Sequence, residues 1–227
     1  MSLKIAPSIL AGDLGALRNE VEEVENGGAD VIHLDVMDGH FAPNITFGPG
    51  TIKALRKYSK LPFDAHLMIN DPLLYLDSFV DAGCDIISVH AEVCTEEAFG
   101  EIIKKLNENG VKAGIAVNPD TEIPDWIVHK LDSIYLLNVM SVRPGFSGQK
   151  FMPEVLPKLS KIGEIINEKG VETMIEADGG VDVSNVYDLV RRGARILVAG
   201  NAVCGQPDVG KAIRELKERA LPAIKEV

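Results

Sequence analysis

The chain has 227 residues, of which 46% are hydrophobic and 25% are charged. A chain of this length suits one large α/β domain or two small ones, and its composition excludes a disordered or fibrous protein. The formal net charge of −11 argues against nucleic acid or an anionic membrane as the main partner, because both require a cationic surface.

The cysteines and the first residues bear on the cellular compartment. Cys84, Cys94 and Cys204 show no C-x-x-C spacing, and any disulfide would leave one of them unpaired, which favours a reducing compartment. The N-terminus lacks the charged segment and apolar core of a signal peptide, and no apolar run approaches the roughly 20 residues of a membrane span. The sequence therefore predicts a cytoplasmic protein.

Short β-rich runs recur along the whole chain and alternate with amphipathic stretches. The predicted strands are residues 3–10, 30–37, 62–69, 85–92, 112–118, 134–142, 172–180 and 195–200. In the predicted helices 14–28, 96–110 and 155–170, apolar residues return every three or four positions and glycine closes the segment. Strand and helix alternation implies parallel strands with right-handed crossovers. Eight such units predict a single (β/α)8 TIM barrel over residues 1–227, with a doubly wound open sheet as the alternative.

Active sites in such barrels lie where the strands end, and acids and histidines gather there in this sequence. Alternate residues of a strand share a face, so three strands present polar groups to the barrel interior. These inward residues are His33, Asp35 and Met37 in the second strand, Asp64, His66 and Met68 in the third, and Glu176 and Asp178 in the seventh.

Each of these residues alone could be a hydrogen-bonded core histidine or a capping carboxylate. Together, however, buried carboxylates and imidazoles need mutual charge compensation or a metal ion. A site of two histidines and two aspartates would bind one divalent cation, and this mixed donor set suits zinc, iron(II), manganese or cobalt. We take zinc as the first candidate.

The sequence resembles the ribulose-phosphate 3-epimerase family over nearly its whole length. The segments that carry the resemblance are IAPSIL at 5–10, HLDVMDGHFAPN at 33–44, DAHLMI at 64–69, VHAE at 89–92, NP at 118–119, VMSVRPGFSGQKF at 139–151, ADGGV at 177–181 and VAGNAV at 198–203. The resemblance implies a barrel of the ribulose-phosphate-binding type. It also implies a homo-oligomer, either a dimer or a hexamer.

The resemblance also implies roles for individual residues. His33, Asp35, His66 and Asp178 match the family's metal ligands, and Asp35 and Asp178 also match its catalytic acid/base pair. The residues that match its substrate-binding positions are Ser8, Met37, His66, Met68, Met140, Gly145, Phe146, Ser147, Gly148, Gly179, Gly180, Gly200 and Asn201.

The expected reaction is the interconversion of D-ribulose 5-phosphate and D-xylulose 5-phosphate, a step of the pentose phosphate pathway. Inversion of a carbon beside a ketone requires removal of its proton from one face and its return on the other, so two carboxylates are the minimum machinery. A carboxylate with an ordinary pKa is a weak base for a C–H bond, and a metal ion would stabilise the enediolate as a Lewis acid. Glycine loops and helix N-termini could hold the phosphate of this ketose without a basic patch.

The chain departs from the family pattern in the loops. Ser147 stands where the family usually has glycine, and Asn201 stands where it usually has serine. These changes leave open a 3-epimerase of another ketose phosphate, such as a hexulose 6-phosphate. A sugar-phosphate-binding barrel without catalysis is a further alternative, but the intact aspartates argue against it.

Other polar residues in these segments have structural interpretations. Arg143 is predicted to form a surface ion pair, with substrate contact as its alternative. His90 is predicted to be a core histidine, with a position near the site as its alternative. The predicted loop and cap residues are Asp38, His40, Asn44 and Asp71.

Overall fold

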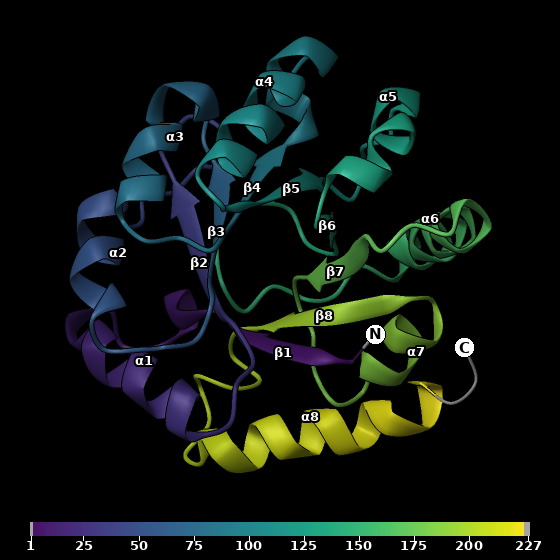
Figure 1. Ribbon diagram of the computed structural model, residues 1–227. Coiled ribbons are helices and arrows are strands. Elements are labelled where there is room, and N and C mark those ends of the chain that lie inside the picture. The colour runs from purple at the N-terminus through teal and green to yellow at the C-terminus, as the bar shows by residue number, and fades with distance from the viewer. Residues whose placement is uncertain (1, 225–227) are drawn as a thin grey trace.

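The computed structural model describes residues 2–224, which form a barrel of eight parallel strands surrounded by helices (Figure 1). The strands are β1 (Lys4–Pro7), β2 (Ile32–Met37), β3 (Phe63–Met68), β4 (Ile86–His90), β5 (Lys112–Val117), β6 (Leu136–Met140), β7 (Met174–Asp178) and β8 (Ala194–Ala199). Each predicted strand is present. The first seven are shorter than the runs that predicted them, and β8 has the same length as its run but begins one residue earlier.

The sheet closes on itself. The hydrogen-bonded order runs β1-β8-β7-β6-β5-β4-β3-β2, and every adjacent pair is parallel. Just past the end of β1, Ser8 forms a parallel bridge with His33 of β2, which joins the two ends of this order. The predicted TIM barrel is therefore confirmed, and the open-sheet alternative is wrong because β1 pairs with β8 on one side and its extension is bridged to β2 on the other.

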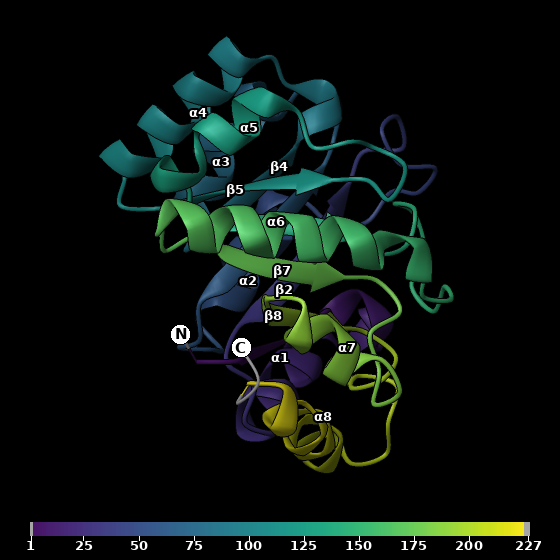
Figure 2. The same cartoon turned by 90° about the vertical axis from the view of Figure 1, so that its right-hand side faces the viewer.

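The helices cover the outside of the barrel (Figures 1 and 2). They are α1 (Leu17–Asn26), α2 (Pro49–Arg56), α3 (Pro72–Asp81), α4 (Glu96–Glu108), α5 (Asp125–His129), α6 (Leu156–Lys169), α7 (Val186–Arg191) and α8 (Val209–Ile224). Short 3-10 turns lie at Ile9–Ala11 (η1), Leu14–Ala16 (η2), Ala91–Val93 (η3), Leu131–Ser133 (η4) and Pro153–Val155 (η5). The helix predicted over 14–28 begins later, at Leu17, because the Asp13 carboxylate accepts a hydrogen bond from Gly15 and holds a tighter turn.

The alternation of side chains along β2 separates the apolar core from the functional face. Ile32, Leu34 and Val36 point outward into the main hydrophobic core between sheet and helices. Met37 belongs to a separate small apolar cluster with Met68, next to the inward-facing polar residues. All six residues of β2 are buried, so the polar set on the inner face requires partners.

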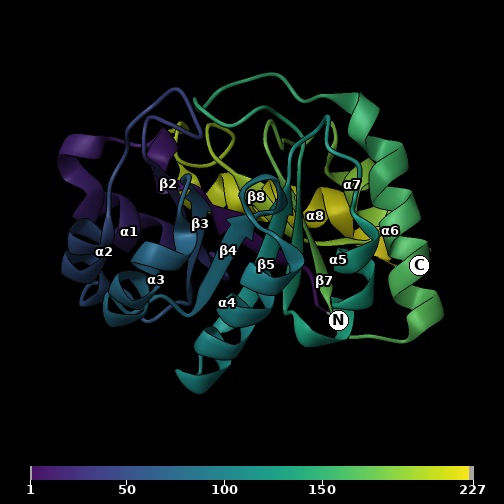
Figure 3. The ribbon, with the colours of Figure 1, turned by 90° about the horizontal axis from the view of Figure 1, so that it is seen from above.

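The loops that follow the strands gather at one end of the barrel (Figure 3). Since all strands are parallel, their carboxyl ends and the residues just beyond them meet there. Within residues 2–224, no helix is long and apolar enough to cross a membrane.

Candidate active site

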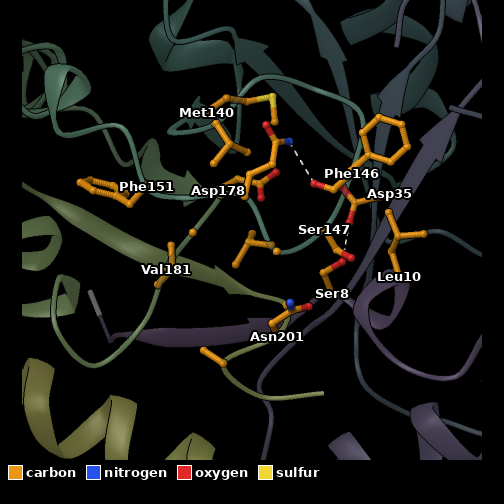
Figure 4. Close-up of a pocket in the computed structure, with 18 of the residues that line it drawn as sticks. Ser8, Leu10, Asp35, Met140, Phe146, Ser147, Phe151, Asp178, Val181 and Asn201 are labelled. Atoms are coloured by element: carbon orange, nitrogen blue, oxygen red, sulfur yellow. Dashed lines mark hydrogen bonds between the residues drawn. The ribbon is translucent and has the colours of Figure 1, made fainter. Parts of the chain in front are cut away.

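A pocket of about 560 Å³ opens where the strands end (Figure 4). Asp35 of β2 and Asp178 of β7 both line it, and β1 and β8 lie between these two strands in the barrel. His33 and His66 are fully buried and sit behind the two carboxylates. The residues predicted from three different strands therefore converge at one place.

Four potential ligand atoms face one another in this cluster. His33 Nε2 lies 3.5 Å from Asp35 Oδ1 and 3.6 Å from Asp178 Oδ2. His66 Nδ1 lies 3.7 Å from Asp35 Oδ1 and 3.1 Å from Asp178 Oδ2. Two ligands at about 2.1 Å from a tetrahedral ion would stand about 3.4 Å apart, so these spacings match the edges of such a site.

The hydrogen bonding of the two histidines also fits a cation. His33 Nε2 and His66 Nδ1 are buried and make no hydrogen bond of acceptable geometry, although carboxylates surround them. Buried polar atoms without partners are uncommon in folded proteins. Two orphaned imidazole nitrogens that face two carboxylate oxygens are the donor set that a divalent transition metal binds.

The ionisation of the aspartates suits the same purpose. Burial by itself would raise the pKa of Asp35, but His33 and His66 lower it below its ordinary value. The same balance, in which the two nearby histidines favour the ionised carboxylate over the effect of burial, lowers the pKa of Asp178 to about 2. Both carboxylates are therefore ionised at neutral pH and available as ligands.

The histidines respond to the same charges in the opposite sense. Burial opposes the charged imidazole of His33, but the nearby carboxylates of Asp35, Asp178 and Asp64 raise its pKa well above the ordinary value. For His66, burial likewise opposes a rise that Asp178 and Asp35 produce. The cluster without a cation thus attracts protons, which a bound cation would displace.

A second layer of buried carboxyl groups supports His33 from behind. His33 Nδ1 donates to Asp64 Oδ2 at 3.2 Å, which leaves Nε2 as the nitrogen that faces the aspartates. Glu176 lies next to this pair, and burial followed by the Asp64 charge raises its pKa well above its ordinary value. The raised pKa favours the neutral form of Glu176, which would limit the negative charge enclosed in the barrel.

Each catalytic candidate also has a polar neighbour outside the cluster. Ser8 donates its hydroxyl to Asp35 Oδ2, the oxygen that is turned away from the histidines (Figure 4). Asn138 Nδ2 donates to Asp178 Oδ2 at 3.4 Å. These contacts help to orient the two carboxylates.

The pocket lining includes nearly all predicted substrate-binding residues. Those that line it are Ser8, Met37, Met68, Met140, Gly145, Phe146, Ser147, Gly148, Gly179, Gly180, Gly200 and Asn201. His66 does not line the pocket, because it is fully buried in the layer behind the aspartates. Any contact of His66 with a substrate would have to pass the residues in front of it.

Glycines after β7 permit a close approach between two loops. Gly180 has φ +62°, and a Cβ there would lie 2.5 Å from the backbone nitrogen of Phe151 in the preceding loop. Gly179 has φ +116°, and a Cβ there would lie 2.8 Å from the nitrogen of Val142. A side chain at either position would push the loop after β6 away from the pocket.

The departures from the family pattern lie on the pocket wall. Ser147 and Asn201 both line it, and a Cβ on Gly148 would stand 2.7 Å from Asn201 Nδ2, so these loops touch. Arg143 also lines the pocket, but its side chain is 71% exposed and its guanidinium pairs with Asp120 at 2.7 Å. The surface ion pair predicted for Arg143 is thus present.

The loop and cap residues hold the chain around the site. Asp38 accepts hydrogen bonds from the backbone nitrogens of His40, Phe41 and Asn70, and Asp71 caps α3. Asn44 Nδ2 donates to the carbonyl of Gly145 at 2.8 Å, which ties the loop after β2 to the loop after β6.

Sequence reasoning missed several contributors to the pocket and its surroundings. Leu10, Phe151, Val181 and Gln206 line the pocket but were not among the predicted substrate-binding residues. The first three lie at the ends of segments that carry the family resemblance, which was the available signal, whereas Gln206 lies outside these segments. His90 is a buried histidine as predicted, but its Nε2 also lies 2.8 Å from His66 Nε2. Its position at the end of β4, two residues before a glutamate, was the available signal.

The chain was compared with known families, proteins and structures. The model described as the ribulose-phosphate 3-epimerase family matches residues 4–204. Ribulose-phosphate 3-epimerase of Bacillus subtilis (strain 168) is 49% identical over 216 residues, which is 95% of this chain and 98% of that protein. Ribulose-phosphate 3-epimerase of Escherichia coli (strain K12) is 42% identical over 94% of each chain.

The similar solved structures include proteins that are named for other activities. The 3-hexulose-6-phosphate synthase of Salmonella typhimurium superposes with a TM-score of 0.72 at 18% identity and covers 97% of this chain and 100% of its own. The 3-keto-L-gulonate-6-phosphate decarboxylase of Vibrio cholerae has a TM-score of 0.73 at 16% identity and covers 98% and 99%. At such identity these structures establish the barrel fold alone. The family match and the near full-length relatives establish more: the chain belongs to the ribulose-phosphate 3-epimerase family.

Proposed function

We propose that this chain is a metal-dependent 3-epimerase that interconverts D-ribulose 5-phosphate and D-xylulose 5-phosphate. The observation that carries the proposal is the pair of ionised aspartates, Asp35 and Asp178, which line one pocket from strands on different sides of it. Two carboxylates that reach one carbon from different sides are what inversion at C3 requires. Family membership and the relatives named ribulose-phosphate 3-epimerase support this substrate.

The two aspartates divide the proton transfer between them. One carboxylate removes the C3 proton from one face, and the electrons of the C–H bond delocalise into the adjacent ketone to give a planar enediolate. The other carboxyl group then delivers a proton to C3 on the opposite face. In the reverse direction the two groups exchange roles. Because both aspartates are ionised in the cluster as it stands, one of them must take up a proton from water before turnover, so that one enters the reaction as base and the other as acid.

His33, Asp35, His66 and Asp178 would hold the divalent cation. When bound, the cation supplies Lewis-acid stabilisation of the negative charge that develops beside C3. The orphaned nitrogens of the two histidines and the ionised carboxylates support this donor set. We keep zinc as the first candidate, with iron(II), manganese and cobalt as alternatives of similar coordination chemistry.

The remaining pocket residues hold the substrate and exclude competing proton donors. Met37, Met68 and Met140 provide an apolar, polarizable wall that offers no proton to the intermediate. The glycine loops after β6, β7 and β8 let the backbone approach the phosphate closely, which suits a protein with net charge −11. We further propose that residues 1–227 form one catalytic domain that assembles as a homo-oligomer.

A 3-epimerase of a hexulose 6-phosphate is the second candidate, because Ser147 and Asn201 both depart from the family pattern and both line the pocket. The deciding experiment assays a panel of ketose phosphates with metal-stripped protein and with protein reconstituted with each candidate metal. We expect D-ribulose 5-phosphate to give the highest kcat/KM, and only in the presence of a divalent metal. A higher value for a hexulose 6-phosphate would replace the proposed substrate, and full activity without metal would refute the cofactor.

A further inference from the structure

A chain of hydrogen bonds leads from the cluster of two histidines and two aspartates toward the protein surface. His66 faces the aspartates with Nδ1, and its other nitrogen, Nε2, lies 2.8 Å from Nε2 of His90. His90 Nδ1 in turn lies 2.9 Å from Glu92 Oε2. His90 is fully buried, while the Glu92 side chain is 20% exposed.

The direction of these hydrogen bonds follows from their last member. An ionised carboxylate can only accept, so His90 Nδ1 carries the proton and donates it to Glu92. A neutral His90 then has a lone pair on Nε2, which accepts the Nε2 proton of His66. His66 consequently has its own lone pair on Nδ1, the atom that faces Asp35 and Asp178.

The Glu92 carboxylate is itself held in place from a neighbouring loop. Its Oε1 accepts the backbone N–H of Asn118 at 2.8 Å, and the pKa of Glu92 is lowered to about 2 because its neighbours, His90 first among them, favour the ionised form over the effect of burial. Lys158 of α6 fixes this loop by donating to the carbonyls of Asn118, Pro119 and Thr121 at 2.8, 2.8 and 2.6 Å. The orientation of Glu92 is therefore set by the fold rather than by solvent.

The His90 ring has little freedom to reorient. The Phe41 ring lies against it with centroids 4.4 Å apart, and the His66 ring lies 4.9 Å away with an interplanar angle of 18°. His33, by contrast, donates directly to the Asp64 carboxylate, so only His66 depends on an interposed imidazole.

We propose that His90 and Glu92 are positioning residues that select the tautomer of His66 and thereby set the affinity of the cluster for its divalent cation. Histidine ligands of metals usually donate their second N–H to a fixed acceptor, and loss of that acceptor typically costs about 10–100-fold in metal affinity. This inference rests on the proposed function only for the presence of the cation. It does not depend on the substrate or on the two-base mechanism.

The substitution Glu92→Gln tests the direction of the hydrogen bonds with almost no change in shape. The Asn118 N–H holds an acceptor at the Oε1 position, so the amide oxygen of the glutamine would lie there and its NH2 group would face His90. His90 Nδ1 would then accept, its Nε2 would donate to His66, and the proton of His66 would move to Nδ1. The variant thus opposes metal binding at that nitrogen.

Metal affinity is measured by competition between the protein and a fluorescent chelator for Co²⁺ and Zn²⁺. The matched control is Glu97→Gln, which removes the same charge from an exposed position in the first turn of α4. We expect Glu92→Gln to raise the Kd for both ions about 10–100-fold and Glu97→Gln to leave it unchanged. In ¹⁵N spectra of the zinc-loaded parent, His66 should carry its proton on Nε2, and the Co²⁺ absorption bands should change in Glu92→Gln alone.

A second variant covers the case in which Glu92→Gln does not fold. His90→Phe keeps an aromatic ring against Phe41 but removes the acceptor for His66, so it should also raise the Kd. Parent affinity in either folded variant, or an Nδ1 proton on His66 in the zinc-loaded parent, would overturn the inference while leaving the cation site in place. A parent protein that binds neither ion would overturn both the cation site and the inference.

Discussion

At the scale of single residues, the proposed mechanism gives Asp35 and Asp178 two duties that usually belong to different groups, namely metal ligation and proton transfer. Each points an oxygen at the histidines, and each lines the substrate pocket. Their lowered pKa values favour metal binding but weaken them as bases, so proton removal depends on strong stabilisation of the enediolate. His33 and His66 are fully buried behind them, so the aspartates, and not the histidines, line the pocket.

Substitution of either aspartate by asparagine should abolish inversion while leaving proton exchange from one face. Asn has nearly the same shape but cannot transfer the proton, so we expect Asp35→Asn and Asp178→Asn each to lose about 10²–10⁴-fold in epimerisation. The measurement pairs metal analysis with incorporation of deuterium at C3 of the substrate in heavy water.

Metal analysis separates the two roles of the aspartates. A variant that retains its metal should still exchange the C3 proton through its remaining carboxylate without forming the other epimer. Near-parent epimerisation by a metal-loaded variant at either position would contradict the two-base mechanism.

At the scale of elements, the loops after β6, β7 and β8 form the pocket wall opposite β2 and β3. The loops after β6 and β7 approach each other closely at glycines, since Gly180 lies against Phe151 and Gly179 lies against Val142. The loop after β6 is also tied to other elements through Asn44 and through the Arg143–Asp120 pair. The shape of the wall thus depends on the absence of side chains as much as on their presence.

Gly180→Ala should therefore impair substrate binding more than it impairs folding. Its Cβ would collide with the backbone of Phe151. The control is Gly170→Ala at the end of α6, because Gly170 has a similar φ of +65° and a Cβ there would have no atom within 4 Å. Both variants should lose about 1–2 kcal/mol of stability from the left-handed backbone conformation. Only Gly180→Ala should also lower kcat/KM, and equal kinetics in the two variants would refute this role of the loop contact.

Removal of the phosphate from the substrate tests the same wall from the other side. Binding energy from the phosphate helps to position C3 between the two aspartates, so we expect a large loss of kcat/KM for D-ribulose relative to D-ribulose 5-phosphate. Kinetic comparison of the two ketoses measures this loss. Equal catalytic efficiency would mean that the glycine loops do not hold a phosphate.

At the scale of the whole molecule, the proposed metal site makes the stability of the barrel depend on its cation. The interior of β2, β3 and β7 encloses His33, Asp35, Asp64, His66, Glu176 and Asp178 among apolar strands. Charges at this depth are tolerated when they compensate one another or bind a cation. The folded state should therefore bind metal far better than the unfolded chain does.

Removal of the metal should lower the melting temperature. Free metal at 100 times its Kd would stabilise the folded protein by about 2.7 kcal/mol, which corresponds to roughly 5–11 °C for a chain of this size. Calorimetry with and without a chelator measures the shift. The double variant His33→Ala/His66→Ala should melt at a temperature that the chelator does not change, and an equal shift in parent and variant would place the cation elsewhere.

The sequence by itself determined the barrel fold and the four residues of the candidate metal site. Eight strand and helix repeats specify parallel strands, and the period of two along a strand places His33 with Asp35 on the inner face. Both patterns extend over short stretches of the chain, so they can be recognised in the sequence alone. The exact start of α1 was not predictable in this way, because the Asp13 turn competes with the helical pattern over only a few residues.

Only the tertiary structure showed which residues support these four side chains from behind. The contacts of His66 with His90, of Glu92 with Asn118, and of Lys158 with the loop after β5 join residues that are 24, 26 and up to 40 positions apart. No periodicity records such contacts, since they depend on barrel closure and on side-chain directions at the strand ends. The same reason explains why His90 is read from sequence as an ordinary core histidine, whereas in the fold it is hydrogen-bonded to His66.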